Sequence, residues 1–96
     1  MAGQLEDRVA VITGAGEGIG RGIASAFVKE GAKVVIAEIN AELGNAAVSE
    51  LGDNAIFVET DVSVKEDNER MIAAAVDQWG TLDILVNNAW GGGVIS

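Results

Sequence analysis

The 96-residue sequence contains no cysteine, no histidine, no tyrosine and no proline. Without cysteine there is neither a disulfide nor a thiolate metal site. Without histidine, the commonest metal ligand and the most frequent general base are both missing. These absences exclude a thiol-based or histidine-based metal centre within this sequence, and we expect it to bind no metal.

Basic residues are few, and the formal net charge is −9. They are scattered along the chain: Arg8, Arg21, Lys29, Lys33, Lys65 and Arg70. Nucleic-acid binding depends on clustered lysine and arginine, so we expect no nucleic-acid partner. The excess of acidic residues is interpreted as an aid to solubility.

Long apolar runs are also missing, since none approaches the ~20 residues that a membrane-spanning helix needs. The N-terminal segment, with Glu6, Asp7 and a lone Arg8, lacks the basic start of a signal peptide. We therefore expect no membrane partner and a cytoplasmic location. Apolar residues make up 49% of the chain and charged residues 22%, which is typical of a globular protein rather than a disordered one.

Four short apolar runs are predicted to be strands: residues 8–13, 33–38, 55–59 and 82–87. They are apolar almost throughout, without strict alternation of apolar and polar residues. This pattern favours strands that are buried on both faces, as in a parallel sheet.

Amphipathic stretches separate these runs and predict helices over residues 18–30, 41–51 and 64–79. The order of strands and helices implies a single α/β domain over residues 1–96, with a parallel sheet and right-handed crossovers. In each predicted helix, apolar residues recur at a spacing of three to four residues. They are Ile19, Ile23, Ala26 and Phe27 in the first, Leu43, Ala47 and Leu51 in the second, and Ile72, Ala75, Val76 and Trp79 in the third.

The predicted helix ends carry capping signals. Asn40 suits the N-cap of the second helix, and Ser63 and Glu66 have the spacing of a capping box before the third. Gly31 and Gly80 stand where the first and third helices should end.

A glycine-rich segment, Thr13-Gly-Ala-Gly-Glu-Gly-Ile-Gly20, joins the first predicted strand to the first helix. Glycine lets the backbone turn sharply and approach a ligand without a Cβ atom in the way. Free N–H groups at the start of the following helix, with about half a positive charge from its dipole, favour an anion. The segment therefore predicts a pyrophosphate site that needs no lysine. Its spacing differs from the common G-x-G-x-x-G fingerprint, and the lack of G-K-[ST] excludes an NTPase-type loop.

This glycine spacing after Thr13 resembles the cofactor signature of the short-chain dehydrogenase/reductase family of oxidoreductases. The resemblance implies a three-layer, doubly wound Rossmann-type α/β fold, incomplete here, with strands in the order 3-2-1-4 of the family's usual seven. It also implies a site for the pyrophosphate of a dinucleotide cofactor, formed by Gly14, Gly16, Gly18, Ile19 and Gly20. Glu17 departs from the small, polar or basic residues often found at its position, so its side chain should point to solvent.

Glu38 closes the second predicted strand, 24 positions after Gly14. In this type of fold, an acid about 20 residues past the fingerprint accepts hydrogen bonds from the ribose hydroxyls of adenosine. A carboxylate also repels a 2′-phosphate, and positions 17, 39 and 40 hold no arginine or lysine that would bind one. We therefore expect the cofactor to be NAD rather than NADP.

Two further motifs match the family in the expected order. Asp61-Val62 follows the third predicted strand, and the resemblance implies that the carboxylate takes the adenine amino group while the next amide meets the ring. Alone, Asp61 would more often be a turn or cap residue. Asn87-Asn-Ala89 closes the fourth strand and resembles the family's Asn-Asn-Ala-Gly motif, so Asn88 and Ala89 are expected to line the cofactor site.

The resemblance places the catalytic Tyr-x-x-x-Lys pair, with its assisting Ser and Asn, beyond this last motif. Because the sequence has no tyrosine, and because Ser96 is not at the matching place, no catalytic residue is assigned and we expect no hydride transfer by this chain alone. In the complete enzyme the substrate would be an alcohol or ketone, and the enzyme a homo-oligomer. Trp90 stands where the family usually has glycine, and the fourth strand is expected to be an exposed, aggregation-prone edge.

Two other interpretations stay open at this point. One is a non-catalytic nucleotide-binding module. The other is a different nucleotide-type fold, such as a methyltransferase with an adenosyl cofactor, against which the glycine segment and Asn87-Asn-Ala89 argue together.

Overall fold

The computed structural model describes residues 3–89, in which strands and helices alternate. The elements are β1 (Val9–Thr13), α1 (Gly18–Lys29), β2 (Lys33–Glu38), α2 (Ala41–Leu51), β3 (Ala55–Glu59), α3 (Lys65–Trp79) and β4 (Ile84–Val86). No helix within residues 3–89 has the length and apolar character that crossing a membrane requires.

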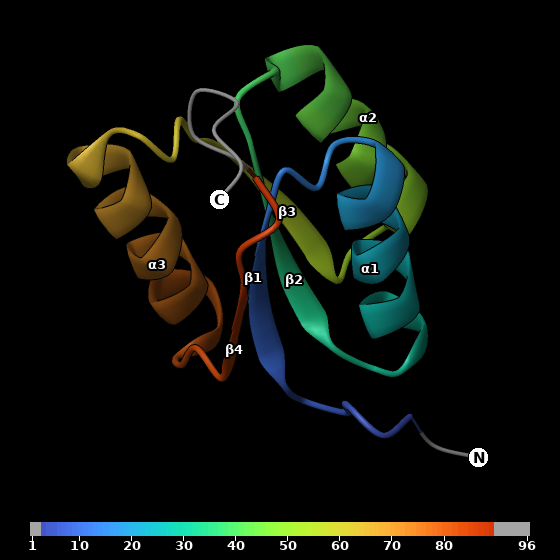
Figure 1. Cartoon of the computed structure of the whole chain (residues 1–96). Helices are drawn as coiled ribbons and strands as arrows, with labels where there is room; N and C mark the ends of the chain where they lie inside the picture. The colour runs from blue at the N-terminus through green and yellow to red at the C-terminus, as the bar shows by residue number, and fades with distance from the viewer. Residues whose placement is uncertain (1–2, 90–96) are drawn as a thin grey trace.

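The four strands form one parallel sheet in the order β3-β2-β1-β4. Helices α1 and α2 cover one face of this sheet and α3 covers the other (Figure 1). The three-layer α/β architecture and the strand order 3-2-1-4 predicted from the sequence are therefore confirmed.

The two faces of the sheet are buried in two separate cores, because successive side chains of a strand point to opposite sides. From β1 and β2, Ile12, Val34 and Ile36 enter the core beneath α1 and α2. Their neighbours enter the second core, beneath α3: Val9, Val11, Val35 and Ala37, with Met71 and Ala75 from the helix. Burial on both sides explains why these strands are almost continuously apolar.

Strand β4 is shorter than the predicted run of residues 82–87, and at each end a side-chain oxygen accepts a backbone N–H where a backbone carbonyl would continue the ladder. Before the strand, the Asp83 N–H donates to the Val9 carbonyl at 2.8 Å, and the Asp83 carboxylate accepts the Val9 N–H at 2.9 Å. After it, Asn88 and Ala89 donate their N–H groups to the Thr13 hydroxyl rather than to a backbone carbonyl.

The helix ranges agree with prediction to within a residue, but the buried faces are rotated. In α1, Ile19 is 77% exposed and Ala26 is exposed, whereas Gly20 and Ala24 are buried. In α3 the buried residues include Met71 as well as the predicted Ala75, while Ile72 and Val76 are 37% and 44% exposed. The recurring apolar residues therefore do not all lie on the buried face, since a three-to-four spacing fits two neighbouring stripes of each helix equally well.

Helix ends follow the predicted signals in three of four cases. The Asn40 side chain accepts the Leu43 N–H at 3.0 Å and caps α2. Gly31 and Gly80 adopt positive φ angles of 95° and 86° where α1 and α3 end.

The predicted capping box at α3 was wrong. The N-cap is Val64, which has no capping side chain, and the Ser63 hydroxyl donates to the Asp61 carboxylate at 2.6 Å instead. In a capping box the serine oxygen would accept an N–H of the helix. Here the hydroxyl donates to an ionised carboxylate, a strong type of hydrogen bond, and this holds the Ser63 side chain at Asp61 rather than at the start of α3.

Candidate functional site

The glycine segment connects β1 to α1 at the carboxyl end of the parallel sheet (Figure 1). Gly14 and Gly18 have φ angles of +63° and +62°, which side chains other than glycine rarely adopt. A Cβ atom added at Gly18 would meet no other atom of the described residues within 4 Å. The backbone beside Gly18 is therefore open on the side where a ligand would approach.

The first turn of α1 presents backbone N–H groups that no side chain within residues 3–89 caps. Its N-cap, Glu17, has an extended backbone and makes no capping hydrogen bond. Glu17 is exposed, as predicted from the sequence. No acidic residue lies within the first turn. By contrast, α2 is capped by Asn40 and has Glu42 in its first turn. The first N–H groups of α1 lack intrahelical acceptors and retain the dipole that attracts an anion.

Gly20 has different surroundings from Gly18, although both are glycines of the same segment. It is buried, and a Cβ atom there would lie 2.2 Å from the Gly14 carbonyl oxygen and 2.6 Å from the Asn88 side-chain nitrogen. Gly20 thus allows α1 to pack directly against the preceding loop. The sequence predicted that all the glycines surround a ligand and gave no signal for this packing contact.

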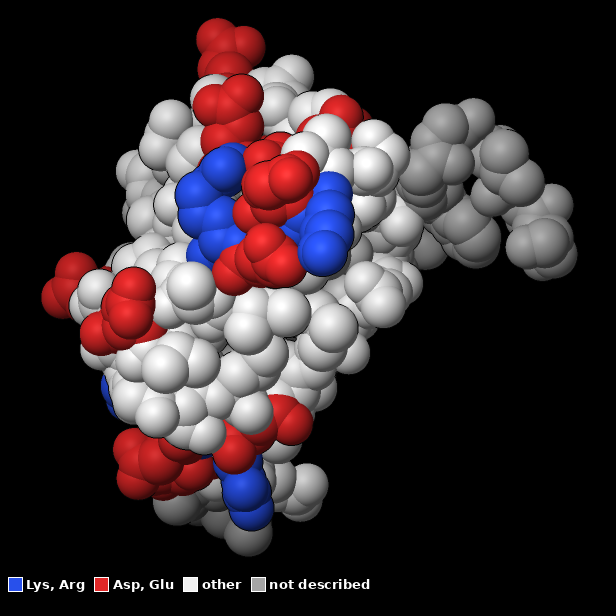
Figure 2. All heavy atoms as spheres, turned by 90° about the vertical axis from the view of Figure 1, so that its left-hand side faces the viewer, with Lys and Arg blue, Asp and Glu red and all other residues white. Residues whose placement is uncertain are grey.

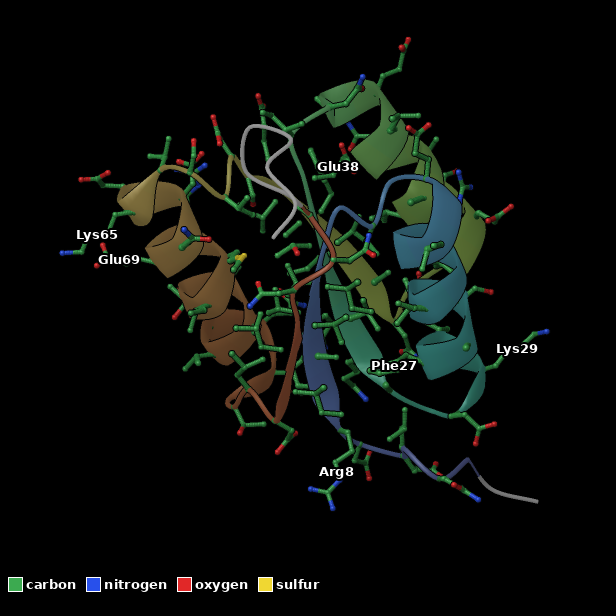
Figure 3. The ribbon with its side chains drawn as sticks, in the orientation of Figure 1. Arg8, Phe27, Lys29, Glu38, Lys65 and Glu69 are labelled. Atoms are coloured by element: carbon green, nitrogen blue, oxygen red, sulfur yellow. The ribbon has the colours of Figure 1, made fainter. Side chains whose placement is uncertain are left out.

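The Glu38 carboxylate lies at the carboxyl end of β2 beside the glycine segment (Figure 3). One of its oxygens accepts the Gly16 N–H at 2.9 Å, and the other accepts the Asn40 N–H at 3.1 Å. Only 7% of the residue is exposed. The structure thus brings Glu38 to the loop, as the sequence predicted, and adds two backbone contacts that the sequence did not indicate.

Thr13 ties the end of β1 to the end of β4, and sequence reasoning missed this. Its fully buried hydroxyl accepts the N–H groups of Asn88 at 2.8 Å and Ala89 at 3.0 Å, and donates to the Val86 carbonyl at 3.3 Å. The Asn88 amide donates in turn to the Gly14 carbonyl at 3.3 Å. The predicted residues Asn88 and Ala89 are therefore held against the glycine loop. Trp90 lies outside the described residues.

Replacing Thr13 by valine should lower the free energy of unfolding by about 2 kcal/mol. Valine has nearly the same shape but leaves two part-buried N–H groups without an acceptor. A buried unsatisfied donor costs about 1–3 kcal/mol, and partial exposure to water puts each of these two at the lower end of that range. Thr13→Ser, which keeps the hydroxyl, is the matched control and should lose less. Urea unfolding of the three proteins measures the difference, and equal midpoints for wild type and Thr13→Val would contradict it.

Asp61 and Val62 follow β3, at the same edge of the sheet as Glu38. Strand β3 pairs with β2, and the Thr60 N–H donates to the Glu38 carbonyl at 2.9 Å. The Asp61 N–H donates to the Asp67 carboxylate at 2.9 Å, and Arg70 lies 3.1 Å from that carboxylate. The start of α3 thus fixes the backbone at Asp61.

The pKa of the Asp61 carboxyl is lowered from its ordinary value. The Ser63 hydroxyl is the larger cause and the Ser63 N–H the smaller, since both donate to the ionised form. Asp61 therefore stays ionised at neutral pH, in the form that accepts hydrogen bonds.

Acidic and basic side chains lie next to one another on the face that α3 presents (Figure 2). The Arg70–Asp67 pair belongs to this face, and Arg70 also donates to the Glu59 carbonyl. Within residues 3–89, no three acidic side chains converge as a metal-binding group.

A parallel sheet with helices on both faces, and a glycine loop opening a helix at its carboxyl edge, defines the doubly wound α/β proteins of Rossmann type. The family model of the short chain dehydrogenases matches residues 8–94. The chain therefore belongs to the short-chain dehydrogenase family of oxidoreductases.

Individual relatives agree with this membership. A sorbitol dehydrogenase of Cereibacter sphaeroides is 45% identical over 86 residues, which are 90% of this chain and 34% of that protein. Tropinone reductase-like 1 of Erythroxylum coca is 44% identical over 86 residues, 90% of this chain and 32% of that protein. The crystal structure of 3-ketoacyl-(acyl-carrier-protein) reductase from Brucella melitensis, complexed with NADH, has 43% identity and a TM-score of 0.83. That match covers 85% of this chain and 34% of the reductase, so the chain spans about a third of the length of these relatives.

Proposed function

We propose that this chain forms the dinucleotide-binding part of an NAD-dependent oxidoreductase. The observation that carries the proposal is the uncapped, open start of α1 beside the buried carboxylate of Glu38. A pyrophosphate fits the free N–H groups of residues 18–20, where the absence of a side chain at Gly18 leaves space for it. The bound cofactor would supply the hydride that such enzymes transfer, and this chain would hold and orient it.

The adenosine end of the cofactor would lie along the carboxyl ends of β2 and β3. Glu38 would accept hydrogen bonds from the ribose hydroxyls, because a carboxylate offers about four acceptor positions and two are already used. Asp61 and Val62 would meet the adenine, and Asn88 and Ala89 would line the loop on its β4 side. The charge of Glu38 favours a free 2′-hydroxyl over a 2′-phosphate, and hence NAD over NADP.

Hydride transfer between the cofactor and its substrate, from an alcohol to NAD or from NADH to a ketone, would belong to the complete enzyme rather than to the residues of this chain. The relatives named above are dehydrogenases and reductases, and they are about three times as long as the matched segment. We further propose that the complete enzyme is cytoplasmic and homo-oligomeric.

Titration of the chain with NAD and with S-adenosylmethionine tests the proposed function directly. Isothermal calorimetry should show saturable binding of NAD and none of S-adenosylmethionine. Tighter binding of S-adenosylmethionine would replace the oxidoreductase proposal with a methyltransferase.

Replacing Glu38 by alanine together with Ile39 by arginine should shift the NADP-to-NAD affinity ratio by about 10- to 100-fold towards NADP. The change removes the repelling carboxylate and adds a guanidinium, whose charge-assisted hydrogen bond contributes about 1.5–3 kcal/mol. Ile39 is 61% exposed directly after β2, so an arginine there has room. Calorimetric dissociation constants for both cofactors measure the ratio, and Ile39→Arg alone is the control. An unaltered ratio in the double variant would remove the argument for NAD.

A further inference from the structure

The peptide groups around Gly16 are held from both sides, although they belong to a segment of glycines. The Gly16 N–H donates to the Glu38 carboxylate at 2.9 Å in a buried hydrogen bond. The Gly16 carbonyl accepts a longer contact, 3.5 Å, from the Arg21 guanidinium. Arg21 is itself paired with Glu50 of α2 at 2.9 Å. The loop is thus held by β2 directly, through Glu38, and by α2 indirectly, through Arg21 of α1.

The contact with Glu38 leaves little room for another arrangement. A Cβ atom at Gly16 would lie 2.7 Å from a Glu38 carboxylate oxygen and 2.8 Å from both Glu38 Cγ and Leu43 Cβ. The second carboxylate oxygen holds the Asn40 N–H at 3.1 Å, so the side chain is fixed at both oxygens. Gly16 and Glu38 therefore form a closely fitted pair across 22 residues of sequence.

We infer that Glu38 is a positioning residue for the glycine loop, in addition to the contact with ribose that the proposed function gives it. By fixing the Gly16 N–H, the carboxylate holds the loop in the conformation that exposes the first N–H groups of α1 to a pyrophosphate. The inference rests on the proposed function for its effect on cofactor, but its structural part concerns the cofactor-free protein.

The physical reason is the freedom of glycine. A segment with four glycines among residues 14–20 has many accessible backbone conformations, and ordering it costs entropy. A charge-assisted hydrogen bond from a buried N–H restricts that freedom before the ligand arrives, which reduces the loss on binding. Loss of the carboxylate should therefore weaken binding even of a ligand that makes no contact with Glu38.

A cofactor analogue without the ribose hydroxyls separates the two contributions of Glu38. We would measure binding of NAD and of nicotinamide 2′,3′-dideoxyadenosine dinucleotide to the full chain and to Glu38→Ala. Positioning predicts that Glu38→Ala binds the dideoxy analogue about tenfold more weakly than wild type does, the effect of one hydrogen bond to a charged group. Equal affinities of the two proteins for the analogue would overturn the inference while leaving NAD binding intact. Absence of NAD binding to wild type would instead refute the proposed function.

The cofactor-free chain gives a second test that does not depend on binding. Amide hydrogen exchange of Gly16, followed by NMR, should be about tenfold faster in Glu38→Ala, while core amides such as that of Ile36 stay protected. Glu59→Ala is the matched control, because Glu59 pairs with Glu38 in register on β3 and is exposed. It removes the same charge without touching the loop and should leave Gly16 unchanged.

The isosteric variant Glu38→Gln keeps the test valid if Glu38→Ala does not fold. Glutamine offers one side-chain oxygen for two N–H groups, so exchange should rise at Gly16 or at Asn40. Unchanged protection of Gly16 in Glu38→Ala, or of both amides in Glu38→Gln, would show that the carboxylate does not hold the loop.

Discussion

Gly20→Ala should lower the free energy of unfolding by about 3 kcal/mol, at the upper end of what overpacking a well-packed site costs. The added methyl group would lie 2.2 Å from the Gly14 carbonyl oxygen and 2.8 Å from its carbon, and these are backbone atoms. No side-chain rotation can relieve the overlap, so either α1 must move away from β1 or the loop must distort. Thermal and urea unfolding followed by circular dichroism measure the loss.

Gly22→Ala is the control within the same helix. A Cβ atom there would meet nothing within 4 Å among the described residues, and Gly22 is solvent-exposed, away from either end of α1. Alanine should therefore stabilise the protein by about 0.5–1 kcal/mol, because glycine is the weaker helix former. If Gly20→Ala proved as stable as Gly22→Ala, the close packing of α1 on the glycine loop would not exist in solution.

The glycines of α1 show what the sequence could and could not predict. Local patterns were sufficient for the strands, for the helix ranges and for the Asn40 cap, because each depends on neighbours within a few positions. The sequence does not show that glycines 18, 20 and 22 differ: Gly18 lies beside the proposed ligand space, Gly20 packs against the Gly14 backbone, and Gly22 is exposed on the outer side of α1. Such differences arise only when α1 is placed against β1 and β4.

The candidate site likewise has features that the sequence could predict and contacts, between residues far apart in the sequence, that it could not. The positions of Glu38 and Asp61 could be predicted, because the carboxyl ends of parallel strands share one edge of the sheet. The contacts of the Thr13 hydroxyl could not, since they join residues 75 and 76 positions apart. The failed capping box at Ser63 has another cause. A capping box needs the serine oxygen to accept an N–H of the helix, whereas the Ser63 hydroxyl donates to the neighbouring Asp61 carboxylate, and the capping pattern alone does not include that carboxylate.

Gly18→Val should weaken NAD binding by about 100-fold or more. The valine side chain would project into the open space beside the first turn of α1, where the proposed pyrophosphate lies. Two charge-assisted hydrogen bonds of about 1.5 kcal/mol each correspond to a factor of that size. Calorimetric titration of wild type and variant with NAD measures the effect.

Backbone strain must be separated from obstruction, because Gly18 has a φ angle of +62°. Gly80→Val introduces a side chain at a comparable angle, +86°, with nothing within 4 Å, at the C-terminal end of α3. Both valine variants should lose about 1–2 kcal/mol of stability, or somewhat more for a branched side chain, because valine disfavours the left-handed conformation. Only Gly18→Val should also lose affinity for NAD. Gly18→Asn sharpens the comparison, because asparagine tolerates this conformation and still fills the space. Full NAD affinity in a folded Gly18→Asn protein would mean that no phosphate approaches the start of α1, and the proposed cofactor site would have to be abandoned.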